Sequence, residues 1–286
     1  MSGNSSKVPL QTSSQLHGRS IPVVLLRLFH AVLRFVTRVW RMVLPSLQNI
    51  EDAFHRRLLS LRFEIRSFFP KTRNEFAGFQ ARDVPVIVIN LVRRKDRLRD
   101  VVDNLNRVGF RDVRILEAVD GPATYPELLR GHAANLGCTQ SHMAAVLDNL
   151  NDLHPIAVCE DDNEFIEQPE KIFELIESFL ETPNYDVLCL SSRTRGPKIS
   201  VSPEFHLVTW AMAPAFYILK PRAKNKVLAS YRTSIRRLKE QRRKGPFDQV
   251  WRKTQRYSLF FVRPKTKVAR QKESHSDIQG RFFEGT

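Results

Sequence analysis

The sequence predicts an α/β fold in which a mostly parallel sheet carries helices on both faces. Short β-branched segments alternate along the chain with segments that have the periodicity of amphipathic helices, and this alternation is typical of strand–helix–strand units. The first such segment, VPVIVINL at residues 84–91, is a nearly continuous apolar run, as expected of a strand buried on both faces. The 286 residues are enough for one large or two small domains with a sizeable core.

The predicted elements follow one another in order from residue 84. After the first strand comes a helix whose apolar stripe contains Leu98, Val101 and Leu105 and which ends at Gly109. Further strands are predicted at residues 112–121, 155–162, 185–192 and 213–220, and further helices at residues 139–152, 169–181 and 221–234. In sheets of this kind, ligands bind in the crevice beyond the carboxyl ends of the strands.

The residues that precede this pattern divide into two parts. Residues 1–20 are polar and are predicted to be a disordered tail. Residues 21–80 are predicted to be a basic, amphipathic helical extension, and residues 81–286 to be the α/β domain. Within the extension, helical periodicity continues through residues 46–80 as far as Pro70.

Residues 21–45 form a long apolar segment, but four of its arginines lie on one face of the predicted helix. An arginine near a bilayer centre costs roughly 2.5–3.5 kcal/mol, which offsets the gain from the apolar residues. We therefore expect the helix to lie in the plane of an anionic membrane surface, at the cytoplasmic face of a membrane. A helix packed on the domain or on a partner, a true span, and a purely cytoplasmic protein are the alternatives. The four residues are Arg27, Arg34, Arg38 and Arg41.

Charge and cysteine content indicate which ligands and which redox compartment to expect. The net charge is +16, with an acidic stretch at residues 81–219 between two basic ends, which indicates a cation-binding centre and anionic partners. Solvated charge without a partner is the alternative. Cys138, Cys159 and Cys189 have no C-x-x-C spacing, and the last two lie in apolar runs, where a free thiol behaves as a core residue. So few cysteines fit a reducing compartment better than a disulfide framework.

Three carboxylates, Glu160, Asp161 and Asp162, stand at the end of the strand predicted at residues 155–162. Because alternate side chains of a strand point the same way, Glu160 and Asp162 are expected to share one face and Asp161 to point to the other. Two convergent carboxylates suit Mg²⁺ or Mn²⁺, hard ions that also take water and phosphate oxygens. A solvated acidic loop, or caps for the next helix, would also explain the triplet.

A second group of candidates lies at the predicted starts of two helices. The segment NLVRRKDR, which begins at Asn90, supplies Arg93, Arg94 and Arg97, and guanidinium groups at a helix start suit phosphate. The segment GCTQSH supplies Ser141 and His142 at the helix predicted from residue 139. A charged helix start and a serine cap beside a core histidine are the corresponding structural explanations. Late in the chain stand Asp248, His275 and Asp277.

Taken in order, these motifs resemble those of glycosyltransferase family 25, which includes the lipooligosaccharide galactosyltransferases of lipopolysaccharide biosynthesis and the procollagen galactosyltransferases. The matching segments are INLVRRKDR, VDG, GCTQSH, AVCEDD, APAFYIL, FDQVW and HSDIQG, and they span residues 84–280. The resemblance implies a GT-A-like nucleotide-diphospho-sugar transferase fold, a UDP-sugar donor (most often UDP-galactose) and transfer with inversion. The segment APAFYIL lacks the usual pair of threonines, which leaves the acceptor open between a glycan, a lipid-linked glycan and a protein hydroxyl.

The resemblance also implies roles for the candidate residues. Glu160 and Asp162 would hold Mn²⁺ or Mg²⁺, and Asp161 would orient the site or contact the sugar or ribose. His275 would complete the metal shell or bind phosphate. The catalytic base would be Asp248 or, as second choice, Asp277. Nucleotide and donor would be bound by Asn90, Arg94, Arg97, Ser141 and His142.

Two other classes of protein are compatible with parts of the sequence. The basic segment RRLKEQRRKG at residues 236–245 is compatible with a nucleic-acid-binding protein or a nuclease. However, aromatic residues are not interleaved with the basic ones, and no helix-turn-helix, RRM or zinc-finger pattern is present, so no nucleic acid is expected as a partner. A catalytically inactive, membrane-associated relative is the other alternative, and the intact carboxylate triplet argues against it.

Overall fold

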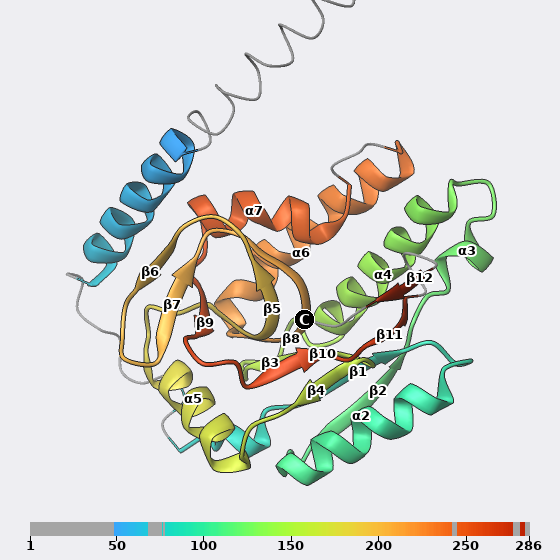
Figure 1. Cartoon of the computed structure of the whole chain (residues 1–286), viewed down its shortest axis with the longest axis horizontal. Coiled ribbons are helices and arrows are strands. Elements are labelled where there is room, and N and C mark those ends of the chain that lie inside the picture. Colours follow the sequence, from blue (N-terminus) through green and yellow to red (C-terminus); the bar gives the residue numbers. More distant parts are fainter. Residues whose placement is uncertain (1–48, 68–75, 77, 242–244, 277–280, 284–286) are drawn as a thin grey trace, which may run out of the picture. The chain divides into compact units, whose positions relative to one another are not determined.

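The computed structural model describes residues 49–67, 76, 78–241, 245–276 and 281–283 (Figure 1). The predicted tail and the basic segment at residues 21–45 lie outside these residues. Residues Glu51–Thr286 form one compact unit.

The predicted fold class is confirmed: the chain is an α/β protein with helices on both faces of a central sheet. A helix over residues 49–67 comes first. It is followed by a 3₁₀ helix, η1 (Ala81–Asp83), and by helices α2 (Lys95–Val108), α3 (Gly121–Thr124), α4 (Arg130–Leu147), α5 (Pro169–Glu181), α6 (Pro221–Lys239) and α7 (Phe247–Tyr257). The strands are β1 (Val86–Asn90), β2 (Val113–Glu117), β3 (Ile156–Glu160), β4 (Asn163–Phe165), β5 (Val187–Thr194), β6 (Lys198–Ser200), β7 (Phe205–Val208), β8 (Ala211–Leu219), β9 (Phe261–Pro264), β10 (Ala269–Gln271), β11 (Ser274–Ser276) and β12 (Arg281–Phe283).

The central sheet has eight strands in the order β2-β1-β3-β8-β5-β9-β7-β6. Strand β1 is parallel to both β2 and β3, and β9 is parallel to β5. Strand β8 is antiparallel to both β3 and β5, so β5 runs in the direction of β3. The hairpin of β7 and β6 completes one edge. The sheet is therefore mostly parallel, with β8 and β7 as the strands that run the other way.

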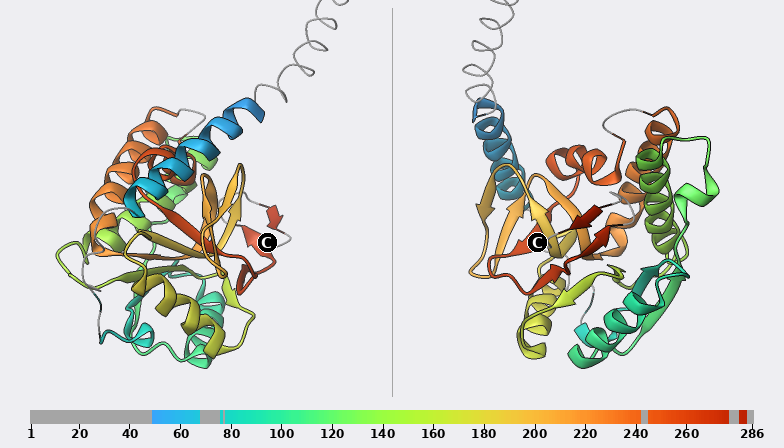
Figure 2. Two further views of the ribbon diagram at one scale, coloured as in Figure 1. Left: turned by 90° about the vertical axis from the view of Figure 1, so that its left-hand side faces the viewer. Right: turned by 45° about the vertical axis from the view of Figure 1, so that its right-hand side comes forward.

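Alternation along the strands creates two hydrophobic cores, one on each face of the sheet. Val88 and Cys159 face the first core, which α2 and α5 cover. Ile89 and Val158 face the second core, which α4, α6 and α7 cover. Figure 1 shows these two groups of helices on opposite sides of the sheet, and Figure 2 shows α4 and α6 packed side by side. The expectation that Cys159 and Cys189 are core residues is confirmed, because both are buried.

The helix over residues 49–67 packs on this compact unit through one face. Leu59 is buried in the first core, and Arg66 donates a hydrogen bond to the buried carboxylate of Asp186 (2.9 Å), which also accepts one from Arg222 (2.6 Å). Phe54, Leu61 and Ile65 are exposed. Across the described residues, none of the helices has the length and apolarity needed to cross a membrane.

Helix α4 differs from its prediction, and its start is wrong by nine residues. It begins at Arg130 rather than at residue 139, so Thr139 and Ser141 lie inside the helix and are not its caps. Their hydroxyls donate instead to backbone carbonyls four residues earlier, from Thr139 to Asn135 (2.8 Å) and from Ser141 to Gly137 (2.8 Å). Helix α6 also continues five residues past its predicted end at residue 234.

Gly137 allows α4 to approach the loop that follows β2. A Cβ atom at Gly137 would lie 2.4 Å from the carbonyl oxygen of Val119 and 2.6 Å from the backbone nitrogen of Gly121. One turn further along the helix, Ser141 Oγ accepts a hydrogen bond from the backbone N–H of Val119 (2.9 Å). The absence of a side chain at Gly137 thus allows the close approach, and the hydroxyl of Ser141 binds the loop to the helix.

The substitution Gly137→Ala is therefore expected to destabilise the protein, although alanine favours a helix by about 1 kcal/mol relative to glycine. The added methyl group meets backbone atoms that cannot move aside, and overpacking of this kind costs roughly 1–3 kcal/mol. Urea unfolding of the two proteins measures the difference. Gly131→Ala in the same helix is the matched control, because a Cβ there meets no atom within 4 Å and should be neutral or stabilising. Equal effects of the two substitutions would contradict this account.

Candidate active site at the crevice between β1 and β3

The candidate site lies between two neighbouring strands, β1 and β3, whose helical connections lie on opposite faces of the sheet. Helix α2 connects β1 to β2 over one face of the sheet, whereas α4 precedes β3 and covers the other face. Strands β1, β2 and β3 are mutually parallel, so their carboxyl ends meet at one edge. Such an arrangement opens a crevice between the two middle strands, here β1 and β3, and α/β proteins bind ligands there. Asn90 ends β1 and Glu160 ends β3, which places the acidic triplet at this crevice.

Glu160 and Asp162 converge on one partner, Gln271 of β10. Its Nε2 lies 3.4 Å from Glu160 Oε2 and 3.1 Å from Asp162 Oδ2. Asp161 turns toward the other strand, where its carboxylate accepts hydrogen bonds from Asn90 Nδ2 (2.8 Å) and Arg97 Nη1 (3.0 Å). The predicted grouping thus appears, although β3 ends at Glu160 and strand alternation does not extend to the aspartates. All three carboxylates line the same cavity.

The surroundings of the three carboxylates disfavour their charged forms. Burial raises the pKa of Glu160 to about 8, and the charges of Asp161 and Asp248 add to the rise. Burial likewise raises the pKa of Asp162 to about 8, followed by repulsion from Glu160 and Asp161. Burial also raises the pKa of Asp161, against the opposing effect of Arg97. Among the described residues, Asp162 Oδ1 is buried without a hydrogen-bond partner. A site of this kind favours protons or a cation.

His142 is a buried neighbour of Glu160. Its Nε2 lies 3.1 Å from Glu160 Oε1, and its Nδ1 lies 2.9 Å from the hydroxyl of Tyr217, which is 2.6 Å from the hydroxyl of Tyr231. Burial lowers the pKa of His142 to about 3, so the ring is neutral at pH 7. A neutral ring has one N–H and one acceptor nitrogen, and the tyrosine hydroxyls complete its hydrogen bonds.

The arginines that follow β1 differ in what they contact. Arg97 lines the cavity and holds Asp161, and Arg93 lines the cavity and pairs with Asp120. Arg94, the N-cap residue of α2, donates to the exposed carboxylate of Asp96 (3.2 Å). Of the three arginines in this segment, Arg93 and Arg97 therefore stand on the cavity wall.

The triplet lines a cavity of about 130 Å³. A wider hollow of about 700 Å³ adjoins it and shares Leu91, Arg93 and Asp120 with it. This second hollow lies beyond the carboxyl ends of β1 and β2 and reaches Thr124. Together they form a continuous depression along the edge where the parallel strands end. The other predicted residues on the cavity wall are Ser141 and His142.

Asp248 lies in the first turn of α7, where its Oδ2 accepts a hydrogen bond from the backbone N–H of Ala213 (3.3 Å). Ala213 has a φ of 42°, a left-handed conformation that costs a non-glycine residue of order 1–3 kcal/mol and is enriched at functional sites. Burial raises the pKa of Asp248, and backbone hydrogen bonds oppose that rise. His275 belongs to β11, but its side chain lies outside the described part of the chain, as does Asp277.

Gln271 and Cys138 are site residues that the sequence analysis missed. Gln271 is more than a hundred residues from the triplet and reaches it because β10 pairs with β4, directly after the triplet. Nothing in the local sequence marks this glutamine. Cys138 had a signal, its position four residues before His142, but it was not assigned to a site.

The fold and the site together define an α/β protein with a carboxylate-lined crevice flanked by arginines. Among solved structures, the chain is similar to the apo form of mouse xyloside xylosyltransferase 1, with a TM-score of 0.33 and 11% identity over 64% of this chain and 72% of that one. It is also similar to a mannose-1-phosphate geranyltransferase from Thermus thermophilus, with a TM-score of 0.35 and 9% identity over 64% and 73%. A third match is a nucleoside-diphosphate-sugar pyrophosphorylase from Vibrio cholerae, with a TM-score of 0.33 and 13% identity over 68% and 78%.

Likenesses this weak carry no conclusion about activity. No protein-family profile matches the sequence, and no curated protein does. The relation to glycosyltransferase family 25 therefore stays a prediction from the motifs, and the function must be argued from the site.

Proposed function

We propose that this protein is a metal-assisted, inverting glycosyltransferase that moves a sugar, galactose in the first instance, from a UDP-sugar to a hydroxyl group of an acceptor. The observation that carries the proposal is the cluster of three carboxylates at the crevice between β1 and β3. Burial disfavours the charged forms of Glu160 and Asp162, which a cation would stabilise, and the members of the cluster are the ones that the motif order assigns to the donor site. Arginines border the same cavity, as a donor with two phosphates requires.

A divalent ion fits the donor atoms present. Glu160 and Asp162 offer oxygen ligands that suit Mn²⁺ or Mg²⁺, and the partnerless Oδ1 of Asp162 is free to accept a cation. Glu160 and Asp162 would hold the ion, and its positive charge would offset the charge that builds on the leaving UDP. Gln271 would keep the two carboxylates together through its amide.

The remaining residues would place the donor. The hollow beyond β1 and β2 is the proposed seat of the nucleotide, and the cavity at the triplet is the proposed seat of the diphosphate and sugar. Arg93 and Arg97 would bind phosphate oxygens bidentately. Asn90 and Arg97 hold Asp161 in one orientation, so that its carboxylate could contact the ribose or sugar.

Inversion requires a base that removes the proton of the acceptor hydroxyl during attack on the sugar. Asp248 is the proposed base. Its burial moves its pKa toward neutrality, which suits a general base that operates near pH 7. Asp277 is the second candidate.

A screen of UDP-sugars for release of UDP tests the proposed activity. UDP-galactose, UDP-glucose and UDP-N-acetylhexosamines are each incubated with the full chain, with Mn²⁺, with Mg²⁺ or with EDTA. We expect UDP release from one of these donors that requires a divalent ion. Metal-independent release, or none from any donor, would refute the proposal.

We also propose that residues 21–45 bind an anionic membrane surface, which would bring a soluble donor and a lipid-linked acceptor to one enzyme. The support is the narrow arginine face of the predicted helix, together with the exposed Phe54, Leu61 and Ile65 further along the chain.

The chain should sediment with anionic vesicles, and replacement of the four arginines by glutamine, or high salt, should weaken this binding. The experiment uses the full chain and not a chain that starts at residue 81. Truncation at residue 81 would remove Arg66 and leave Asp186 without one of its partners. Equal sedimentation of the substituted protein would contradict the proposal.

A further inference from the structure

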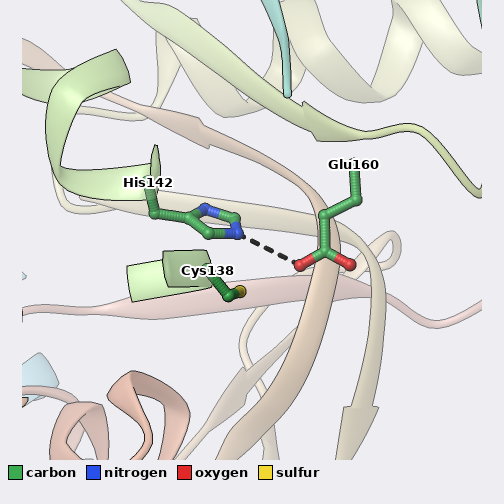
Figure 3. A group of neighbouring side chains, drawn as sticks. All are labelled: Cys138, His142 and Glu160. Carbon is green, nitrogen blue, oxygen red and sulfur yellow. Dashed lines mark hydrogen bonds and ion pairs between the residues drawn. The ribbon is translucent and has the colours of Figure 1, made fainter. Parts of the chain in front are cut away.

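Cys138, His142 and Glu160 form a compact group at the wall of the cavity (Figure 3). Cys138 and His142 are four residues apart on α4 and therefore lie on the same face of the helix, one turn apart. Glu160 reaches the same point from the end of β3. One ligand atom from each side chain lies within 4.8 Å of the other two.

The three donors match those of zinc sites that keep an open position. Zn²⁺ binds cysteine sulfur, histidine nitrogen and carboxylate oxygen, and three protein ligands leave a fourth place for water or another ligand. With bonds of about 2.0–2.1 Å at tetrahedral angles, nitrogen and oxygen ligands stand about 3.3 Å apart. The observed separation of His142 Nε2 and Glu160 Oε1 is 3.1 Å. In the ion-free protein this separation is that of a hydrogen bond, and it is also close to the spacing of two ligands on one ion.

The histidine is also supported as a metal-binding histidine usually is. Its second nitrogen, Nδ1, contacts the hydroxyl of Tyr217 at 2.9 Å, and a second hydroxyl from Tyr231 completes a buried chain. A partner on the second nitrogen fixes the ring orientation of a ligating histidine. Because a hydroxyl both donates and accepts, this pair serves either tautomer of the ring, including the one that presents a bare Nε2 to an ion.

The group also has a path for an ion, because all three residues line the cavity and Cys138 is only partly buried. Its donor set differs from that of the neighbouring carboxylates. Glu160 and Asp162 alone offer oxygen to a hard ion, whereas a thiolate and an imidazole favour softer ions such as Zn²⁺.

We infer that Cys138, His142 and Glu160 form a second cation site, which binds Zn²⁺ and shares Glu160 with the oxygen site of Glu160 and Asp162. The thiol of Cys138 releases its proton to solvent as the bond between sulfur and zinc forms. Because one carboxylate cannot serve both ions equally, Zn²⁺ and Mn²⁺ compete, and Zn²⁺ inhibits. The inhibition rests on the proposed function, but Zn²⁺ binding does not.

Co²⁺ is the probe that reports the sulfur ligand directly, through the near-ultraviolet absorption of a thiolate bound to this ion. The full chain should show this absorption on addition of one equivalent of Co²⁺. Cys138→Ser should abolish it, and Cys189→Ala, which removes a buried thiol from β5, should leave it unchanged. No thiolate absorption in the wild-type protein, or its persistence in Cys138→Ser, would overturn the inference.

Zn²⁺ affinity, measured by competition with a chromophoric chelator, tests the other ligands. We expect Tyr217→Phe to weaken Zn²⁺ binding about 10–100-fold, the usual effect of losing the partner of a ligating histidine. An unchanged affinity would show that Tyr217 does not support His142 as a ligand of Zn²⁺.

The shared carboxylate is tested by the affinity for Mn²⁺. Bound Zn²⁺ should lower this affinity in the wild-type protein but not in Cys138→Ser. Independent binding of the two ions would overturn the shared site, whereas failure of the proposed transferase activity would leave the Co²⁺ result intact.

Discussion

Asp162→Asn and Glu160→Gln should each lower the rate of sugar transfer by more than about a hundredfold. Each substitution removes a charged oxygen ligand from the proposed ion, and the ion's stabilisation of the leaving diphosphate is worth several kcal/mol, with about 1.4 kcal/mol for each factor of ten. Each amide keeps one oxygen and gains one nitrogen, so Asp162→Asn can still accept the hydrogen bond from Gln271, and Glu160→Gln can face His142 Nε2 with either group. Initial rates with saturating Mn²⁺ and UDP-sugar measure the loss. Retention of more than about a tenth of the rate would show that the ion is held elsewhere.

The same two variants provide a test of folding that does not depend on activity. In the ion-free protein Glu160 and Asp162 have folded-state pKa values raised to about 8, whereas the unfolded chain ionises them near their ordinary values of 4.5 and 3.8. Between about pH 4 and pH 8 the unfolded state therefore releases protons that the folded state retains, and stability falls as pH rises. The amides lack this penalty. Their melting temperatures in EDTA should exceed that of the wild-type protein, by a margin that grows from pH 4 to pH 8.

Asp248→Asn should lower kcat by about 10²–10⁴-fold, the usual contribution of a general base. Asparagine keeps an oxygen that can accept the hydrogen bond from the Ala213 backbone, so the site should hold its shape. The affinity for UDP-sugar and Mn²⁺ should change little, because the base acts on the acceptor. The measurement is kcat as a function of pH, in which the limb that reports ionisation of the base should disappear. An unchanged profile would transfer the role to Asp277, for which Asp277→Asn is the parallel test.

Elements with clear periodicity were predictable from the sequence. Helix α5 has the predicted bounds of residues 169–181, because a proline opens it and its apolar stripe is regular. Helix α2 ends before Gly109, whose φ of 100° is the left-handed conformation that glycine adopts at a helix end. Residue type and spacing decide such boundaries locally.

Helix α4 was not predictable in the same way. Its middle turns contain Gly137, Thr139 and Ser141, which by propensity favour turns and caps. Tertiary contacts override these preferences: the glycine is needed for the approach to Val119 and Gly121, and the serine binds the backbone of Val119. In the local sequence, a glycine or serine that packs against a distant loop therefore cannot be distinguished from one that ends or caps a helix.

The site was predictable to the extent that it follows strand ends. The triplet, Asn90 and Arg97 lie together because parallel strands end at one edge of the sheet. Gln271 was not predictable, because it depends on the pairing of the short strands β10 and β4. The partners of His142 were likewise invisible, since they come from β8 and α6.

The central claim is that the carboxylates at the end of β3 bind a divalent ion that in turn holds a UDP-sugar. Calorimetric titration of UDP-galactose into the full chain, with Mn²⁺ and with EDTA, tests it most directly, and UDP-glucose and UDP-N-acetylhexosamines are titrated in parallel. The account predicts one-to-one binding of a UDP-sugar that requires Mn²⁺ and is lost in Asp162→Asn. Binding that is equally strong in EDTA, or the absence of binding to every UDP-sugar, would contradict it.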